Sequence, residues 1–342
     1  MNRNVSLDYL RGISAIGIMI YHFGSWSYGL FDSSTILSRI GIYGVTIFYI
    51  LSGATLYQVY SKNILLTSKH LCVFYLKRIA RIFPLLWLVN IFTIVVDYNS
   101  HFNLKFIFLN FTGLFGFLSW DQYIATGAWS IGNELVFYFL FPIFIYFSNL
   151  NLKIFLLLTL FLIYFYFSFL ILKPDIPISQ QWYFYTNPLN HVFMFYCGML
   201  ISTYKVKDSY KKGLIYLFLV GIIIFIFLPV EGYSSNLVFG TPRLLFSFSA
   251  LLIVLFFVNT NFKLNKRVEI LLASFGEYSY SIYMFHPIMY LIVYKFFNLL
   301  KFSNAFIALR LSITIVLTLI FSRFVYLYFE RRITDFIKNR IN

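Results

Sequence analysis

The sequence predicts an all-α membrane protein, a polytopic bundle of about ten transmembrane helices. Three observations lead to this prediction. Hydrophobic residues make up 60% of the 342 residues, and mean hydropathy is +0.79. Charged residues make up 11%, less than half the roughly 25% of an average globular protein. The apolar residues also form long runs between short basic segments. So few polar residues cannot cover a water-soluble fold, which excludes disordered chains, coiled coils and nucleic-acid-binding modules as well.

The apolar runs define the spans, because about 20 residues of helix cross ~30 Å of hydrocarbon. In chain order, we predict spans near 8–26, 40–60, 82–98, 128–147, 154–172, 188–204, 213–230, 243–259, 276–298 and 305–328. The run 106–118 is too short to cross, so we expect it to be re-entrant or packed at the outer side. No repeat or linker divides the chain, so we expect one membrane domain over 1–342, without an appended outer domain.

The basic residues predict the orientation of this bundle. With the N-terminus inside, 20 of the 27 Lys and Arg fall on the cytoplasmic side. The remaining seven lie outside: Arg39, Lys105, Lys173, Arg243, Lys295, Lys301 and Arg310. Because cytoplasmic loops are enriched in Lys and Arg, both termini are predicted to be cytoplasmic. The two cysteines are far apart and have neither disulfide nor zinc spacing, so no metal site is expected.

Ionisable residues inside spans are candidates for function, since each costs about 2.5–3.5 kcal/mol at the bilayer centre on insertion scales. Only three acids are predicted at membrane depth: Asp8, Glu134 and Glu277. Their candidate basic and titratable partners are Arg11, His22, Arg78, Arg81 and His286.

The first span, LDYLRGISAIGIMIYHF, contains an acid, a base and a histidine. Asp8 and Arg11 are three residues apart, so they share a helix face and are expected to form an ion pair. His22 follows Asp8 by fourteen residues, about 21 Å along the axis, so Asp8 cannot orient it. An imidazole exchanges protons near neutral pH, which makes His22 a candidate catalytic residue. The alternative is an interfacial histidine bonded to a neighbour.

The segment KRIARIFP precedes the third span and contains Arg78 and Arg81 at i, i+3. On a helix these form one guanidinium face at the cytoplasmic surface, and guanidinium groups bind phosphate bidentately. The alternative is ordinary basic flanking of a span.

Glu134 lies in WSIGNELVFYFLFP, at about the depth of His22 and with no basic residue between Lys105 and Lys153. A carboxylate at that depth needs a partner, and His22 is the best-placed titratable group. The alternative is a bond to a Trp or Asn of the bundle. His286, in GEYSYSIYMFHP, is a supporting candidate, for which helix packing beside Pro287 is the alternative.

Together these segments resemble the acyltransferase-3 family of integral membrane acyltransferases. The matching pieces are LDYLRG with YHF, GVTIFYILSG, KRIARIFP, WSIGNELVFYFLFP and SYSIYMFHP, in family order over residues 7 to 287. The second span has Phe48 and Tyr49 where the family commonly has paired aromatics before LSG. The resemblance assigns the family's essential residues to Arg11, His22, Arg78, Arg81 and Glu134.

The resemblance implies an O-acetyltransferase of the bacterial inner membrane. It implies an acyl-CoA donor, by default acetyl-CoA, and an acceptor hydroxyl on a surface or lipid-linked glycan such as O-antigen or exopolysaccharide. The expected partners are donor, glycan and membrane lipids, without nucleic acid, and no permanently bound cofactor or metal is expected. The alternative class is a flippase or polymerase of lipid-linked glycan, whose charges would line a cavity through several spans.

The resemblance also implies a role for each candidate residue. Arg78 and Arg81 would hold the donor phosphates, and the pantetheine arm would reach His22. His22 would remove a proton from the acceptor hydroxyl or accept the acyl group itself, and Glu134 would orient its imidazole. Arg11, held by Asp8, would neutralise further phosphate charge.

Overall fold

The computed structural model describes residues 4–61, 67–96, 103–203, 206–262, 264–302 and 304–341. Over these residues the chain forms helices and no strand, which confirms the all-α prediction. The α-helices are α1 (Val5–Tyr28), α2 (Ile36–Tyr60), α3 (Ser68–Val96), α4 (Leu104–Thr112), α5 (Phe115–Leu118), α6 (Trp129–Asn149), α7 (Lys153–Tyr166), α8 (Trp182–Tyr185), α9 (Val192–Thr203), α10 (Lys211–Phe227), α11 (Gly240–Asn259), α12 (Lys266–Glu277), α13 (Ser279–Leu299), α14 (Ile307–Val325) and α15 (Arg331–Ile341). Short 3₁₀ or π turns are η1 (Phe167–Ile171), η2 (Ile178–Gln181), η3 (Pro188–Asn190), η4 (Asp208–Tyr210), η5 (Ser234–Leu237), η6 (Asn304–Phe306) and η7 (Tyr326–Glu330).

A helix lies in each of the ten predicted spans, although residues 97 and 98 of the third and residue 204 of the sixth are outside the described residues. Among the described helices, six are long and apolar enough to cross a bilayer: α2, α3, α6, α7 with η1, α11, and α14 continued to Ile337. α9 and α10 have 12 and 17 residues, which is short for a crossing. The count of ten and the cytoplasmic termini therefore stay predictions.

Two predicted segments differ in detail from the structure. The ninth span was predicted to begin at 276, but the helix breaks at Tyr278, so Glu277 ends α12 rather than lying inside α13. The run 106–118 forms α4 and α5, which pack on α3 and α6. The indole of Trp87 anchors α4 by donating to the carbonyl of Phe111 at 2.7 Å.

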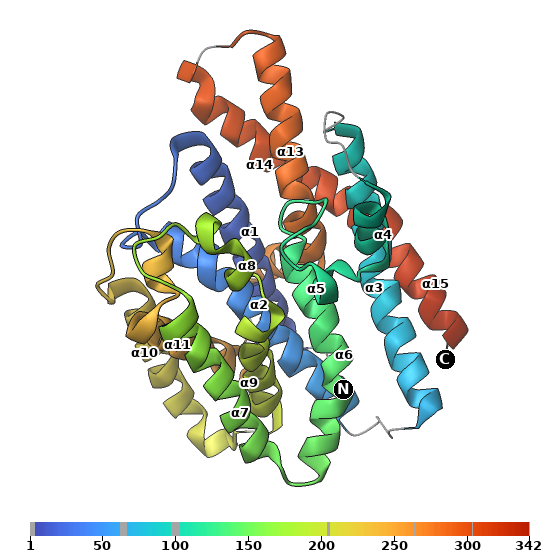
Figure 1. Cartoon of the computed structure of the whole chain (residues 1–342), viewed down its shortest axis with the longest axis vertical. Helices are drawn as coiled ribbons and strands as arrows, with labels where there is room; N and C mark the ends of the chain where they lie inside the picture. Colours follow the sequence, from blue (N-terminus) through green and yellow to red (C-terminus); the bar gives the residue numbers. More distant parts are fainter. Residues whose placement is uncertain are drawn as a thin grey trace.

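Helix α1 is the centre of the arrangement that positions the site, because it packs against α2, α12 and α13 (Figure 1). α12 approaches α1 so closely that a Cβ on Gly276 would lie 2.1 Å from the carbonyl oxygen of Asp8. In the same way, a Cβ on Gly53 of α2 would lie 1.9 Å from the carbonyl oxygen of Phe195 on α9. Small residues permit such contacts between membrane helices, where packing replaces the hydrophobic effect as the driving force.

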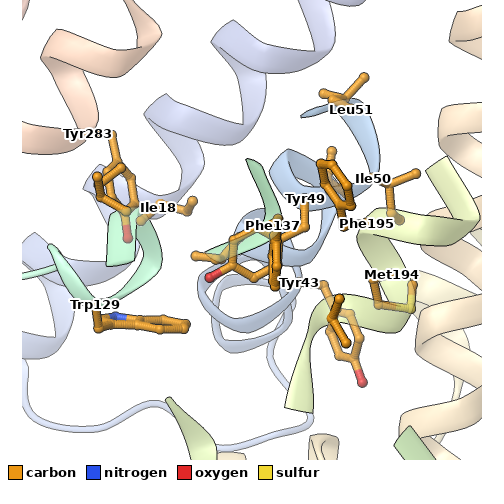
Figure 2. Packing of buried hydrophobic residues seen from close by; sticks show 14 of the residues in the cluster. Ile18, Tyr43, Tyr49, Ile50, Leu51, Trp129, Phe137, Met194, Phe195 and Tyr283 are labelled. Atoms are coloured by element: carbon orange, nitrogen blue, oxygen red, sulfur yellow. The ribbon is translucent and has the colours of Figure 1, made fainter. Parts of the chain in front are cut away.

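Aromatic side chains fill the interior where α2, α6 and α9 meet (Figure 2). The ring of Phe137 contacts those of Tyr49 and Phe195, with centroids 5.1 and 5.2 Å away. In contrast, large apolar side chains of α7, α10 and α14 remain exposed, among them Leu158, Ile223 and Ile320. A surface of this kind is stable in lipid and prone to aggregation in water.

Candidate active site

His22 of α1 contacts His286 of α13. Its Nδ1 atom lies 2.8 Å from Nε2 of His286, and the two rings stack with centroids 5.0 Å apart. Trp26, one helical turn after His22, stacks on both imidazoles at 5.1 and 5.9 Å. His286 is fully buried. Aromatic packing therefore holds the two imidazoles in a defined orientation.

The hydrogen bonds of this pair assign its protons. Nδ1 of His286 lies 3.2 Å from the carbonyl oxygen of Ile282, which can only accept, so this nitrogen carries a proton. In a neutral His286, Nε2 is then an acceptor, and Nδ1 of His22 donates to it. The assignment leaves Nε2 of His22 unprotonated, which is the state that a general base requires.

His22 lines a chamber that, together with the open space at its mouth, leaves about 1350 Å³ unoccupied by protein atoms. We call it the outer chamber, because it is bordered by the loops that follow α1, α7 and α10, on the side predicted to face outward. Its aromatic lining residues are Tyr21, Phe31, Trp129, Trp182, Tyr185, Tyr233 and Tyr283. The chamber is therefore an amphipathic cavity with a histidine in its wall.

Arg11, Arg78 and Arg81 line a second pocket, which we call the arginine pocket. Together with the open space at its mouth, it leaves about 770 Å³ unoccupied. Both cavities are lined by Val45 and Tyr283, so they adjoin at these side chains. The Tyr283 hydroxyl is held in place, since it donates to the carbonyl of Gly127 at 3.2 Å and bonds with the hydroxyl of Ser130. The structure thus brings the three predicted arginines together, next to the chamber of His22.

Arg78 retains an unused donor. Its Nη2 donates to the hydroxyl of Tyr60 at 3.3 Å, and its guanidinium lies over the rings of Tyr60 and Tyr138 at 5.5 and 5.6 Å. Its buried Nε has no hydrogen-bond partner among the described residues. An unpaired buried N–H costs about 1–3 kcal/mol, which an anionic ligand that accepts it would recover.

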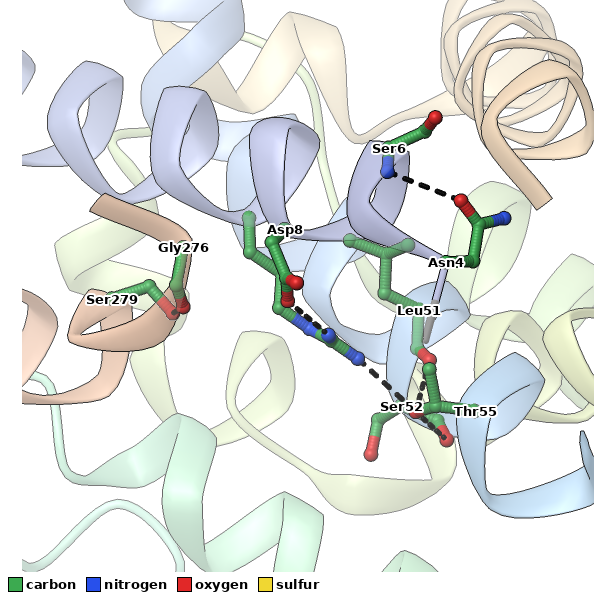
Figure 3. A network of polar contacts seen from close by, with 9 residues as sticks. Asn4, Ser6, Asp8, Leu51, Ser52, Thr55, Gly276 and Ser279 are labelled. Carbon is green, nitrogen blue, oxygen red and sulfur yellow. Dashed lines mark hydrogen bonds and ion pairs between the residues drawn. The ribbon is translucent and has the colours of Figure 1, made fainter. Parts of the chain in front are cut away.

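Arg11 is fixed between Asp8 of α1 and Thr55 of α2, both of which are labelled in Figure 3. Its Nη1 lies 3.3 Å from Oδ1 of Asp8, which confirms the predicted ion pair. Its Nη2 donates to the hydroxyl of Thr55 at 3.2 Å, and Thr55 in turn donates to the carbonyl of Leu51 at 2.7 Å. Asp8 is buried, and Gly276 of α12 packs closely against its backbone.

Glu134 lies in the arginine pocket and does not contact His22. It accepts hydrogen bonds from the hydroxyls of Ser52, at 2.9 Å, and Tyr138. No hydrogen bond joins it to His22 among the described residues, and the expected contact between them is therefore wrong. Two side chains at the same depth in the membrane contact each other only if they lie on facing sides of their helices. The side of α6 that presents Glu134 faces α2, not His22 on α1. Glu134 belongs with the arginines.

Three further polar residues at this site were missed from the sequence. Ser52 lies in the LSG motif and Tyr138 one turn after Glu134, so both had a local signal. Glu330 lies beyond the predicted end of the last span, in the π turn η7, where it accepts from the hydroxyl of Ser281 at 2.8 Å. It interacts electrostatically with Arg81. Such π turns often occur at functional sites.

Residues 4–326 match the family model Acyl_transf_3, which is described as an acyltransferase domain. Neither the curated proteins nor the solved structures contain a match to the chain.

Proposed function

Since the chain belongs to the acyltransferase-3 family, we propose that it transfers an acetyl group from cytoplasmic acetyl-CoA to a hydroxyl of a cell-surface or lipid-linked glycan. The family match and the apolar helices make it a multi-pass membrane acyltransferase. The donor, the acceptor and a location in a bacterial inner membrane are parts of the proposal.

The observation that carries the proposal is the contact between the arginine pocket and the outer chamber at Tyr283 and Val45. Arg11 and His22 are eleven residues apart on α1, which is about 17 Å along the helix axis. Acyl-CoA carries phosphates at one end and its thioester at the far end of a long, narrow arm. A donor whose phosphates bind the arginines therefore directs its thioester toward His22.

The arginine pocket suits the phosphate end of such a donor. Arg78 offers its unpaired Nε, and Arg81 lies on the same side of α3. Arg11 is already oriented by Asp8 and Thr55. Three guanidinium groups match the charge of a diphosphate and a 3′-phosphate better than they match any neutral ligand. Glu134 acts in this proposal as a positioning residue that balances the arginines when no donor is bound.

In the proposed reaction His22 acts as general base. Its Nε2 removes the proton from the acceptor hydroxyl as the oxygen attacks the thioester carbonyl. The O–C bond forms, the C–S bond breaks, and the proton passes from His22 to the departing sulfur, so CoA leaves as the thiol. Meanwhile Nδ1–H of His22 continues to donate to His286, which stabilises the transient imidazolium.

Replacing His22 by alanine tests this function. We expect His22→Ala to lower acetyl transfer by 10²–10⁴-fold or more, because a general base is lost, while the protein still inserts and expresses. The measurement is glycan acetylation, by mass spectrometry, in a deletion strain complemented with each variant. His70→Ala is the matched control, because His70 is remote from both cavities and bonds locally to Thr67. Near-normal acetylation by well-expressed His22→Ala would refute the mechanism.

A further inference from the structure

The outer chamber has an unbalanced charge. Its lining includes the carboxylates of Asp32 and Asp175, and no Lys or Arg is among the described residues that line it. This contrasts with the arginine pocket on the other side of Tyr283, which three guanidinium groups line. The two cavities therefore differ in the sign of the ligand charge that they favour.

Both carboxylates are held in place. Asp32 accepts hydrogen bonds from the backbone N–H groups of Ser34 and Gly232, each at 2.8 Å, and the Ser34 contacts hold the pKa of Asp32 below its usual value. Asp175 accepts from the side-chain amide of Asn236 at 2.8 Å, and its own N–H donates back to that amide oxygen. These bonds join the loops after α1, α7 and α10, so the charges are part of the chamber wall.

The basic residue closest in sequence to Asp32 cannot neutralise a ligand. Arg39 is 2% exposed, and its guanidinium is bound by backbone carbonyls, including those of Ser33 at 3.1 Å, Phe225 at 2.9 Å and Leu228 at 2.8 Å. Its donors are therefore already used within the fold.

The rest of the wall suits a sugar ring. Trp129, Trp182 and Tyr185 form a cluster of contacting rings, with centroids 5.4 to 5.7 Å apart. The indole N–H of Trp182 is bound by the hydroxyl of Tyr123 at 2.9 Å, which fixes that ring. Fixed aromatic faces pack on the apolar C–H face of a pyranose, and carboxylates accept hydrogen bonds from its hydroxyls.

We infer that the acceptor unit admitted to the outer chamber is an uncharged sugar or an amino sugar, and that the chamber disfavours uronic acids, sialic acids and phosphorylated units. An anionic acceptor would face two fixed carboxylates, with no Lys or Arg among the described residues of the chamber wall to pair with it. The inference rests on the proposed function and narrows it to one class of acceptor.

Matched acceptors test the inference. The purified chain in lipid nanodiscs is given acetyl-CoA, and release of the CoA thiol is followed with methyl glucoside against methyl glucuronide, and methyl galactoside against methyl galacturonide. We expect kcat/KM for each acidic sugar to be at least tenfold below that of its neutral twin. Equal or better use of the acidic twin would overturn the inference.

Charge variants distinguish the effect of the two chamber carboxylates on acceptor choice from the effect of surface charge in general. The double variant Asp32→Asn with Asp175→Asn removes both charges. At position 175 the amide oxygen can still accept from Asn236, and at position 32 it can replace one of the two oxygens that accept from Ser34 and Gly232. We expect it to reduce the discrimination to less than threefold, mainly through faster use of the acidic sugars. Glu231→Gln is the control, because Glu231 is exposed in the loop after α10, which contacts both carboxylates, but does not line the chamber. An equal effect of Glu231→Gln would refute a role for the chamber carboxylates.

A measurement without an acceptor keeps the inference testable if the proposed function is wrong. Caesium and iodide ions are used as cationic and anionic quenchers of tryptophan fluorescence. The signal of Trp182 is the fluorescence of the unmodified protein minus that of the Trp182→Phe variant. The quenching constant of each ion is normalised to its value for free N-acetyltryptophanamide. We expect caesium to quench Trp182 more effectively than iodide, and the Asp32→Asn, Asp175→Asn variant to lose this preference. Equal access of iodide would overturn the inference. Failure of every glycoside to raise thiol release would instead count against the proposed function.

Discussion

The reactivity of His22 depends on which of its two ring nitrogens carries the proton. In an imidazole without hydrogen-bond partners, either ring nitrogen can carry the proton. Here the chain of hydrogen bonds from Ile282 through His286 to His22 assigns Nδ1 as the protonated nitrogen. His286 is therefore a positioning residue in the proposed mechanism, and Glu134 acts from the other cavity.

This arrangement predicts which substitutions are coupled. His286→Ala should lower transfer by about 10²-fold, because His22 loses its orientation. Combined with His22→Ala it should cost little more than His22→Ala alone, since members of one catalytic unit are non-additive. In contrast, the losses of His286→Ala and Glu134→Gln should multiply, because His286 acts through His22 of the outer chamber, whereas Glu134 lines the arginine pocket. Acetylation assays at matched membrane expression measure the three single and two double variants.

A spectroscopic readout distinguishes orientation from mere packing. In ¹⁵N-histidine spectra of the protein, His22 should have its proton on Nδ1, and His286→Ala should shift the proton toward Nε2. An unchanged tautomer would contradict the positioning role of His286. Losses of His286→Ala and Glu134→Gln that fail to multiply would contradict the assignment of these two residues to separate units.

Arg78 and Arg81 give a second prediction at the residue scale. Arg78→Ala and Arg81→Ala should weaken donor binding about 10–100-fold each, the loss of a charge-assisted hydrogen bond. Arg78→Lys should rescue only partly, because an ammonium cannot replace a bidentate guanidinium or its stacking on Tyr60 and Tyr138.

The measurement for the arginines is a thermal shift of the purified protein with CoA and with CoA that lacks its 3′-phosphate. If the arginines serve only to orient the protein in the membrane, lysine should substitute fully, since the positive-inside rule treats the two alike. Full rescue by Arg78→Lys, with equal responses to the two ligands, would argue against phosphate binding.

At the scale of elements, the site depends on how closely α12 approaches α1. Gly276→Ala places a Cβ 2.1 Å from the carbonyl oxygen of Asp8, which the helices can accommodate only by moving apart. We expect a loss of about 1–3 kcal/mol in stability, seen as a lower Tm in detergent, together with weaker CoA binding because Asp8 and Arg11 are displaced.

Gly213→Ala is the matched control for this prediction. Gly213 also lies in a helix, α10, but a Cβ there would meet no atom within 4 Å. It should leave Tm and CoA binding unchanged or raise Tm slightly, because alanine favours the helix. If Gly276→Ala behaves like Gly213→Ala, the close contact of α12 with α1 does not position Arg11.

At the scale of the whole molecule, the mechanism requires the arginine pocket to open to the cytoplasm and the outer chamber to the opposite side. The turn between α6 and α7 and the loop around η2 lie at opposite ends of the bundle (Figure 1). In a Cys72→Ser background, where Cys197 is buried, a membrane-impermeant maleimide should label Gln180→Cys in intact cells. It should label Asn149→Cys only after the membrane is opened. The reverse pattern would invert the predicted orientation.

The sequence by itself determined the helical membrane class, the positions of a helix in each of the ten apolar runs, the family and the Asp8–Arg11 ion pair. These features depend on hydrophobic run length and on spacing within one helix, which are local properties. It also identified the three arginines, because the resemblance carries them. Only the tertiary structure decided that His22 meets His286 and that Glu134 meets Ser52. The depth of a residue along a helix can be counted from the sequence. The rotation of each helix about its axis is set by close contacts between residues far apart in the chain, such as Gly276 with Asp8 and Gly53 with Phe195.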